Sequence, residues 1–248
     1  MLTAQIKLSN GATLITYVQD SQIRYRRYKQ RPAMVICPGG AYLVLATGES
    51  EPVAIEFMSR GFQCFILEYS VGASRAHPEY PPNANARYPI QVLQLMEALH
   101  IIQEHADEWH IDTERIYVMG YSAGGHVAAS LGVRWNDMNL VRQLSFVPHD
   151  HELCSTGVIL GYPMLRLDDI PDPLSQNPSN ELPSQATRVY QTLLGVKNPT
   201  EQQKEPLNLA HYITDSAAPT FIWNCVDDPV IDFRTAMVFS MRLTEAGV

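Results

Sequence analysis

One serine of this sequence lies in a pattern that suits nucleophilic catalysis. The run Gly120-Tyr-Ser122-Ala-Gly124-Gly has the form G-x-S-x-G, with the strand-like residues 115–119 before it and the run 123–133, rich in small residues, after it. These flanks predict a strand followed by a helix. A serine held in the sharp turn between them needs neighbours without bulk, and the two glycines supply that clearance. We therefore predict a nucleophile elbow with Ser122 as the nucleophile, the alternative being a simple glycine-rich turn.

A second glycine-rich segment, Pro38-Gly-Gly40-Ala41-Tyr42, follows an earlier apolar run. An acyl-transfer site needs backbone N–H groups about 3 Å from the oxygen that becomes negatively charged. Two glycines after a strand allow the chain to turn an amide toward that oxygen. We expect Gly40, with Ala41 as a further donor, to form an oxyanion hole together with the N–H of Ala123, the residue after the nucleophile. A plain strand-terminating turn is the alternative.

A pair of carboxylates follows the apolar run 220–223 near the end of the sequence. An acid at the end of a late strand, downstream of the serine, would hold a histidine in the correct tautomer and stabilise its charged form. Asp228, which precedes Pro229, is our choice for this acid, and Asp227 is the alternative.

No histidine follows Asp228, so the order serine, acid, histidine is not completed within these 248 residues. None of the eight histidines is favoured as the general base. His126 is expected to face the sheet or a neighbouring loop. His149 and His151 also invite a metal interpretation, but three or four converging ligands are not indicated and no metal site is expected. The remaining five are expected to lie away from the serine: His77, His100, His105, His110 and His211.

Alternating hydrophobic patterns place these residues on a single α/β domain spanning residues 1–248. Strands are expected over 5–8, 13–18, 33–37, 63–67, 115–119, 156–160 and 220–223, the first two joined by the hairpin signal Asn10-Gly11. Helices are expected over 50–60, from Pro89 with an apolar stripe that reaches Trp109, and over 123–133 and 233–246. Strands that alternate with helices predict a mostly parallel sheet. Insertions around 70–88, 136–152 and 168–206 are expected to form a cap or rim over the active site.

The amino-acid composition limits the kinds of molecule that the protein is expected to bind. A net charge of −8 argues against nucleic acid and anionic membrane surfaces and favours a small neutral substrate. No signal peptide is visible, and no run approaches the roughly 18 apolar residues of a membrane-spanning helix. The four cysteines, Cys37, Cys64, Cys154 and Cys225, are far apart. They are expected to be reduced, buried thiols of a cytoplasmic protein.

With these residues in hand, the chain resembles the α/β-hydrolase esterases that include carbohydrate acetyl esterases and acetyl xylan esterase-like proteins. The resemblance is carried by Pro38-Gly-Gly-Ala-Tyr42, Gly120-Tyr-Ser-Ala-Gly-Gly-His126, Gly161-Tyr-Pro163 and Phe221-Ile-Trp-Asn-Cys-Val-Asp-Asp228, with support from 54–62 and 111–118. Two positions depart from related patterns. Pro38 replaces the histidine of the His-Gly-Gly-Gly motif of related lipases, and Ala41 stands where a third glycine is frequent.

The resemblance implies an α/β-hydrolase fold with an eight-stranded type of core sheet and helices on both of its faces, no metal and no cofactor. It also implies hydrolysis of short acyl esters, acetyl esters of carbohydrates among them. We expect Tyr42 to lie near the mouth of the pocket as a substrate-binding residue. In this family the histidine lies on a loop after one further strand. The chain is therefore expected to lack the last strand and the histidine loop. Without that strand the edge of the sheet has unpaired backbone hydrogen-bonding groups, which favour association, so a homo-oligomer is one of the expected states. Two alternatives remain, a peptidase on the same fold and a catalytically inactive binding protein.

Overall fold

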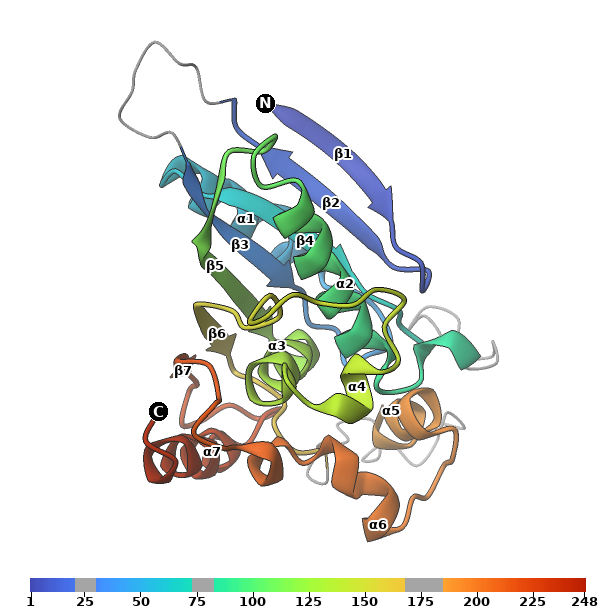
Figure 1. Cartoon of the computed structure of the whole chain (residues 1–248). Helices are drawn as coiled ribbons and strands as arrows, with labels where there is room; N and C mark the ends of the chain where they lie inside the picture. The colour runs from blue at the N-terminus through green and yellow to red at the C-terminus, as the bar shows by residue number, and fades with distance from the viewer. Residues whose placement is uncertain (21–29, 73–82, 168–184) are drawn as a thin grey trace.

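A seven-stranded, mostly parallel sheet organises the molecule (Figure 1). The structure is a computed structural model that describes residues 1–20, 30–72, 83–167 and 185–248. The order of the strands is β1-β2-β4-β3-β5-β6-β7, with β1 and β2 antiparallel to their neighbours and the other pairs parallel. The strands are β1 (Leu2–Lys7), β2 (Thr13–Val18), β3 (Arg31–Cys37), β4 (Gln63–Glu68), β5 (Ile111–Tyr121), β6 (Gly157–Gly161) and β7 (Thr220–Trp223).

Helices cover both faces of the sheet, as the sequence predicts. They are α1 (Glu51–Ser59), α2 (Ile90–Glu104), α3 (Ser122–Arg134), α4 (Met138–Val141), α5 (Gln185–Leu194), α6 (Glu201–Lys204) and α7 (Phe233–Glu245). Short 3-10 helices are η1 (Thr47–Glu49), η2 (Ala84–Ala86), η3 (Glu205–Leu207) and η4 (Leu209–Tyr212). In Figure 1, α1 lies behind the sheet, and α2 and α3 lie in front of it.

The central strands are continuous apolar runs because both of their faces are buried. Along β3, Val35 and Cys37 join the large core cluster under α2 and α3, whereas Met34 and Ile36 join the smaller cluster under α1. Successive side chains of a strand point to opposite faces, so an unbroken apolar run suits a strand covered on both sides.

Two boundaries differ from the expected ones. β5 begins at Ile111 rather than Arg115, because Ile111 pairs with Arg31 of β3 across a register shift. α2 ends at Glu104, before the end of its apolar stripe, yet Trp109 still packs against Phe65 with ring centroids 5.4 Å apart. Tertiary packing therefore extends the buried stripe beyond the helix.

The segment 136–152, expected to contribute to a cap or rim, packs against α2. It connects the end of α3 to the start of β6, and the side chain of Gln103 donates a hydrogen bond to the Glu152 carbonyl at 2.5 Å. Its later part lies beside the end of α2, whereas Gln143 lines a pocket with Asn10 and Gly11 of the hairpin that joins β1 and β2. Residues 73–82 of the insertion around 70–88, and residues 168–184 of the insertion 168–206, lie outside the described residues.

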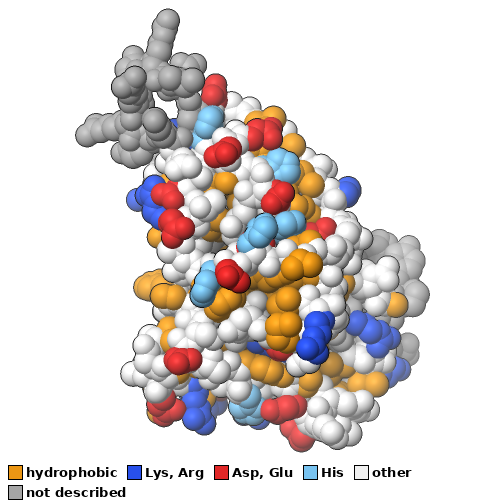
Figure 2. Space-filling model, viewed as in Figure 1, with side chains coloured by type: hydrophobic (Ala, Val, Ile, Leu, Met, Phe, Trp, Pro, Cys, Tyr) orange, Lys and Arg blue, Asp and Glu red, His pale blue; other side chains and the backbone are white. Residues whose placement is uncertain are grey.

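The surface carries charges of both signs, and the cysteines differ in their exposure. On the face shown in Figure 2, acidic and basic side chains of the described residues are interspersed. Cys37 and Cys64 are buried, as expected, and burial raises the pKa of both thiols; Cys225, in contrast, is exposed. None of the described helices combines the length and apolar composition that crossing a bilayer requires.

Candidate active site

Ser122 lies at the junction of β5 and α3 with a backbone φ of 49°. This left-handed conformation is rare for residues other than glycine and is strained. It is sterically possible because of two glycines. A Cβ on Gly120 would lie 2.2 Å from the Gly124 carbonyl oxygen, and a Cβ on Gly124 would lie 2.0 Å from the Cys37 carbonyl oxygen. The turn has the geometry expected of a nucleophile elbow, and Ser122 is partly exposed on it.

The loop after β6 packs directly against the elbow. The N–H of Met164 donates a hydrogen bond to the Ser122 carbonyl at 3.0 Å. Gly125 permits this approach, because a Cβ there would lie 2.8 Å from the Cβ of Pro163. The ends of β5 and β6 therefore hold the serine from two sides.

The segment expected to form the oxyanion hole lies against the serine. Gly40, Ala41 and Tyr42 have φ values of 127°, 55° and 58°. A Cβ on Gly39 would lie 3.0 Å from the Ser122 Cβ. Among the described residues, no hydrogen-bond acceptor faces the N–H groups of Gly40, Ala41 or Ala123. These three donors are thus available to an oxyanion.

Asp228 has the better geometry of the two candidate acids. It is half-buried in the loop between β7 and α7, and Asp227 is exposed. Its Oδ1 accepts hydrogen bonds from the N–H groups of Val230 and Ile231 at 2.8 and 3.0 Å. Within the described part of the chain, Oδ2 accepts none. One oxygen orders the loop, and the other is available to a histidine ring.

Tyr42 is not at the mouth of a pocket, so its expected role in substrate binding requires correction. Its side chain is fully buried, and its hydroxyl lies 2.7 Å from Nδ1 of His126. The ring packs edge-on against Tyr69 with centroids 6.0 Å apart. Since φ is positive at both Ala41 and Tyr42, the backbone turns and carries the side chain into the core.

His126 faces the sheet and a neighbouring loop, as expected. Its Nε2 lies 2.9 Å from the carbonyl oxygen of Leu207, so Nε2 carries the proton and Nδ1 accepts the hydrogen bond from Tyr42. Burial lowers the pKa of His126 to about 4. With both ring nitrogens occupied, this histidine is not available to take a proton from Ser122.

The other described histidines also have separate environments. His211 pairs with the carboxylate of Glu205, and His100 pairs with Glu152 and stacks on Phe146. His105 stacks on Trp109. His110, His149 and His151 precede β5 or β6 and lie at the ends of these strands remote from Ser122. His77 lies outside the described residues. Among the described residues there is also no group of three histidine, cysteine or acidic side chains placed to hold a metal ion.

Sequence reasoning missed one residue beside the serine, Glu49. Its Oε2 accepts the N–H of Gly39 at 2.6 Å, and its Oε1 accepts the hydroxyl of Tyr162 at 2.8 Å. Burial, together with the hydrogen bond to Glu49, raises the pKa of Tyr162, so the hydroxyl stays protonated. Tyr162 belongs to the run Gly161-Tyr-Pro163 that carries the family resemblance, whereas no motif singled out Glu49.

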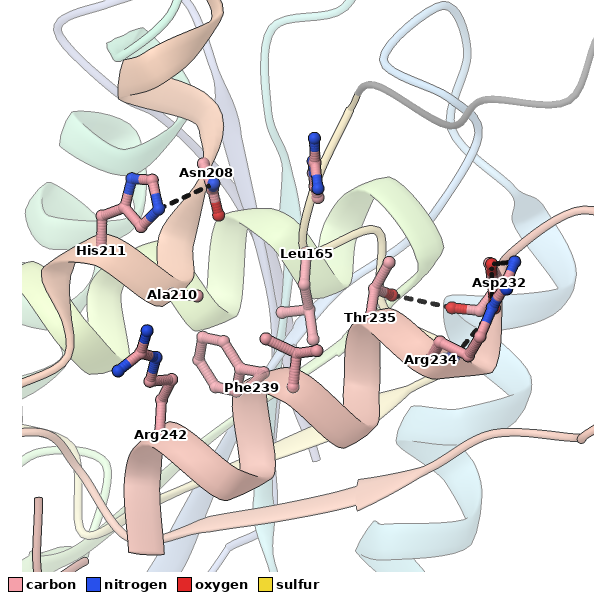
Figure 3. A pocket seen from close by; sticks show the side chains of 11 residues that line it. Leu165, Asn208, Ala210, His211, Asp232, Arg234, Thr235, Phe239 and Arg242 are labelled. Atoms are coloured by element: carbon pink, nitrogen blue, oxygen red, sulfur yellow. Dashed lines mark hydrogen bonds and ion pairs between the residues drawn. The ribbon is translucent and has the colours of Figure 1, made fainter. Parts of the chain in front are cut away.

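A pocket of about 420 Å³ lies beside the loop after β6 (Figure 3). Leu165, His211 and residues of α7, among them Thr235, Phe239 and Arg242, line it. Ser122 does not line this pocket, so the pocket neighbours the candidate site without containing it.

The strand order, the elbow and the loop beside it define an α/β hydrolase, and comparison with solved structures agrees. An acetyl ester-xyloside bifunctional hydrolase from Caldicellulosiruptor lactoaceticus matches 96% of this chain and 75% of its own, with 26% identity and a TM-score of 0.70. A carboxylesterase from Lactobacillus plantarum shares the fold with a TM-score of 0.76 at 21% identity, over all of this chain and 80% of its own.

The chain belongs to the BD-FAE family, whose model matches residues 20–243. The endo-1,4-beta-xylanase B of Butyrivibrio fibrisolvens is 28% identical over 95% of this chain, and the acetylxylan esterase of Xylanibacter ruminicola is 22% identical over 55%. The matches span only 32% and 23% of these two relatives. The α/β-hydrolase fold and the resemblance to this group of esterases are thus confirmed.

The clash at Gly124 gives a stability prediction. Gly124→Ala should lower the free energy of unfolding by about 3 kcal/mol, because the added methyl group meets the backbone carbonyls of Cys37 and Pro38. The control is Gly48→Ala, where a Cβ meets nothing within 4 Å and the change should stay within about 0.5 kcal/mol. Urea unfolding measures both variants. Equal stability of the two would contradict the steric account.

His126 gives a pH prediction. Its pKa lies below the ordinary value in the folded state, so the unfolded chain binds more protons between about pH 4 and 6.5. Stability should therefore fall as the pH falls through this window, by on the order of 3 kcal/mol from this group. His126→Gln should be less stable at pH 7.5 but should lose this part of the pH dependence. Urea unfolding at pH 4.5 to 7.5 tests it, and parallel curves for the two proteins would refute it.

Proposed function

We propose that the protein hydrolyses short acyl esters, acetyl esters of carbohydrates in particular, through an acyl-serine intermediate. The observation that carries this proposal is the position of Ser122, strained on its turn and directly beside the Gly39–Gly40 loop. A serine hydroxyl next to unpaired backbone donors is what attack on an ester carbonyl requires.

The proposed reaction has two halves. Ser122 Oγ attacks the carbonyl carbon while its proton passes to a base, and the N–H groups of Gly40 and Ala123 stabilise the oxyanion. The tetrahedral intermediate collapses, the base returns the proton to the leaving alcohol, and an acyl-serine remains. Water then attacks this ester by the same steps, releases the carboxylic acid and restores the serine.

The base in this proposal is a histidine hydrogen-bonded to Oδ2 of Asp228. Such a histidine is not among the described ones, because each of those is paired elsewhere or lies at the remote end of the sheet. An imidazole held by Asp228 would take the serine proton and carry the resulting charge next to the carboxylate.

Two findings support acetylated carbohydrates as the substrate class. The relatives include an acetylxylan esterase and an acetyl ester-xyloside hydrolase, by their names. The exposed Trp223 lies near the site, with its ring 4.9 Å from that of Tyr162. Aromatic rings near an ester site offer an apolar face to a sugar ring.

In this proposal α5 contributes to the rim around Ser122. The hydroxyl of Tyr190 donates to the Leu167 carbonyl at 2.6 Å, and the N–H of Tyr88 donates to the Leu193 carbonyl at 3.0 Å. The first bond joins α5 to the loop that follows β6, and the second joins α5 to the segment that precedes α2.

Free imidazole should reveal the reaction in the 248-residue chain. We expect imidazole to increase acetate release from xylose tetraacetate and hydrolysis of p-nitrophenyl acetate, with p-nitrophenyl octanoate hydrolysed more slowly. In Ser122→Ala the increase should not exceed that of imidazole in buffer. A variant as active as the unaltered protein would refute Ser122 as the nucleophile. Strong activity without imidazole would instead show that a base is already present.

The acid can be assigned with matched variants. Asp228→Asn keeps an oxygen for the N–H groups of Val230 and Ile231 but loses the charge, so hydrolysis with imidazole should fall at least about tenfold. Asp227→Asn should change it by less than about threefold. The reverse ranking in steady-state kinetics would identify Asp227 as the acid.

A further inference from the structure

Glu49 joins two loops that meet at Ser122. Its carboxylate accepts hydrogen bonds from the Gly39 N–H and the Tyr162 hydroxyl. The position that a Gly39 Cβ would occupy lies 2.7 Å from Glu49 Oε2 and 3.0 Å from the Ser122 Cβ. The carboxylate and the serine Cβ are therefore no more than about 6 Å apart.

The hydrogen bonds at Gly39 determine the direction of the Gly40 amide. The Gly39 carbonyl accepts the N–H of Ala46 at 2.9 Å, and the Gly39 N–H is held by Glu49 at 2.6 Å. In a planar trans peptide the carbonyl and the following N–H point in opposite directions. With the Gly39 carbonyl directed at Ala46, the Gly40 N–H must point away from Ala46. Both peptide units that flank Gly39 are thus held.

The backbone of Glu49 is fixed by the same loop. Its N–H donates to the Ala46 carbonyl at 3.1 Å, and the Ser50 hydroxyl donates to that carbonyl at 3.1 Å. The carboxylate therefore closes the loop 39–49 on itself. The Glu49 side chain thus joins the end of the loop to Gly39, at the point where the loop meets the serine.

Tyr162 fixes the other side of the carboxylate. The N–H of Tyr162 donates to the Trp223 carbonyl at 2.7 Å, which ties the residue to β7. Burial and Glu49 raise its pKa, so the hydroxyl remains a donor throughout the neutral pH range. Two donors on one carboxylate leave it little freedom to rotate toward the oxyanion, where its charge would be repulsive.

We propose that Glu49 is the positioning residue of the oxyanion hole: its carboxylate holds the Gly39–Gly40 segment so that the Gly40 N–H faces the developing oxyanion. The inference rests on the esterase function proposed above. Glu49 itself donates nothing to the substrate and acts through Gly40.

The kinetic test compares Glu49→Ala with Glu49→Gln, in the presence of imidazole. Glu49→Ala should lower kcat for p-nitrophenyl acetate about 100-fold with KM changed less than threefold, because an oxyanion contact forms only in the transition state. Glu49→Gln should stay within about tenfold of the unaltered protein, since its oxygen still accepts the Gly39 N–H and its amide can donate to Tyr162. A loss that falls on KM alone, or a Gln variant as impaired as the Ala variant, would overturn the inference.

The matched control is Glu51→Ala. Glu51 is the same residue type two positions along, and it also accepts a tyrosine hydroxyl, that of Tyr17 at 3.1 Å. We expect its kcat and KM to remain unchanged. Equal losses in both variants would mean that any disturbance at the start of α1 impairs activity, which would also overturn the inference.

A structural readout separates the inference from the proposed function. In a crystal structure of Glu49→Ala the Gly39–Gly40 peptide should be rotated, and the Gly39 amide should lose its protection from hydrogen exchange. An unchanged peptide would refute the positioning role whatever the assay shows. A rotated peptide in a protein that shows no Ser122-dependent hydrolysis would leave the positioning role standing and remove the esterase function.

Discussion

The active-site end of this molecule depends on one steric constraint, the close packing of the first turn of α3 against the ends of β3 and β5. At Gly124 even a methyl group would overlap the Cys37 carbonyl, and at Gly120 it would overlap the Gly124 carbonyl. Only with both positions bare can Ser122 adopt its left-handed conformation and present its hydroxyl. The same packing brings the Gly39–Gly40 loop into contact with the serine, so one arrangement positions both the proposed nucleophile and the proposed oxyanion donors.

That loop is held from two sides by different side chains. On the side of the large core, the buried Tyr42 hydroxyl pairs with His126 of α3, and His126 pairs in turn with the Leu207 carbonyl. On the side of α1, Glu49 pairs with Gly39 and Tyr162. A buried polar group without its partner costs about 1–3 kcal/mol. Moving the loop would break one of these pairs, and donors that do not need to reorganise stabilise a transition state most effectively.

Local sequence patterns predicted much of the fold. The strands 13–18 and 220–223 lie where alternation and apolar runs placed them. The start of β5 was missed because residues 112–114 are polar and look like a loop, although Ile111 pairs with Arg31. Backbone pairing with a neighbouring strand decided this boundary, and a single-sequence pattern does not contain that information.

The candidate site was predictable where the chemistry is local and not where it depends on distant contacts. Gly120 and Gly124 lie close to Ser122 in the sequence, so the local pattern predicts the turn. Tyr42 was expected near the mouth of the pocket, yet its partner His126 is 84 positions away and lets it be buried. Tyr162 lies 113 positions from Glu49, so no spacing rule connects the two.

The loop between β7 and α7, which contains Asp228, is the part of the candidate site whose hydrogen bonding is least complete. Oδ2 of Asp228 accepts no hydrogen bond, and both amide atoms of the buried Asn224 side chain lack a partner among the described residues. The loop follows β7, the strand at the edge of the sheet, where Phe221 and Trp223 are exposed. A group that satisfies both Asp228 and Asn224 must offer a donor to the carboxylate as well as an acceptor and a donor to the amide. A histidine ring with its own backbone meets these requirements, and a base approaching from the β7 edge would reach Asp228 without crossing the oxyanion loop, which lies on the other side of Ser122.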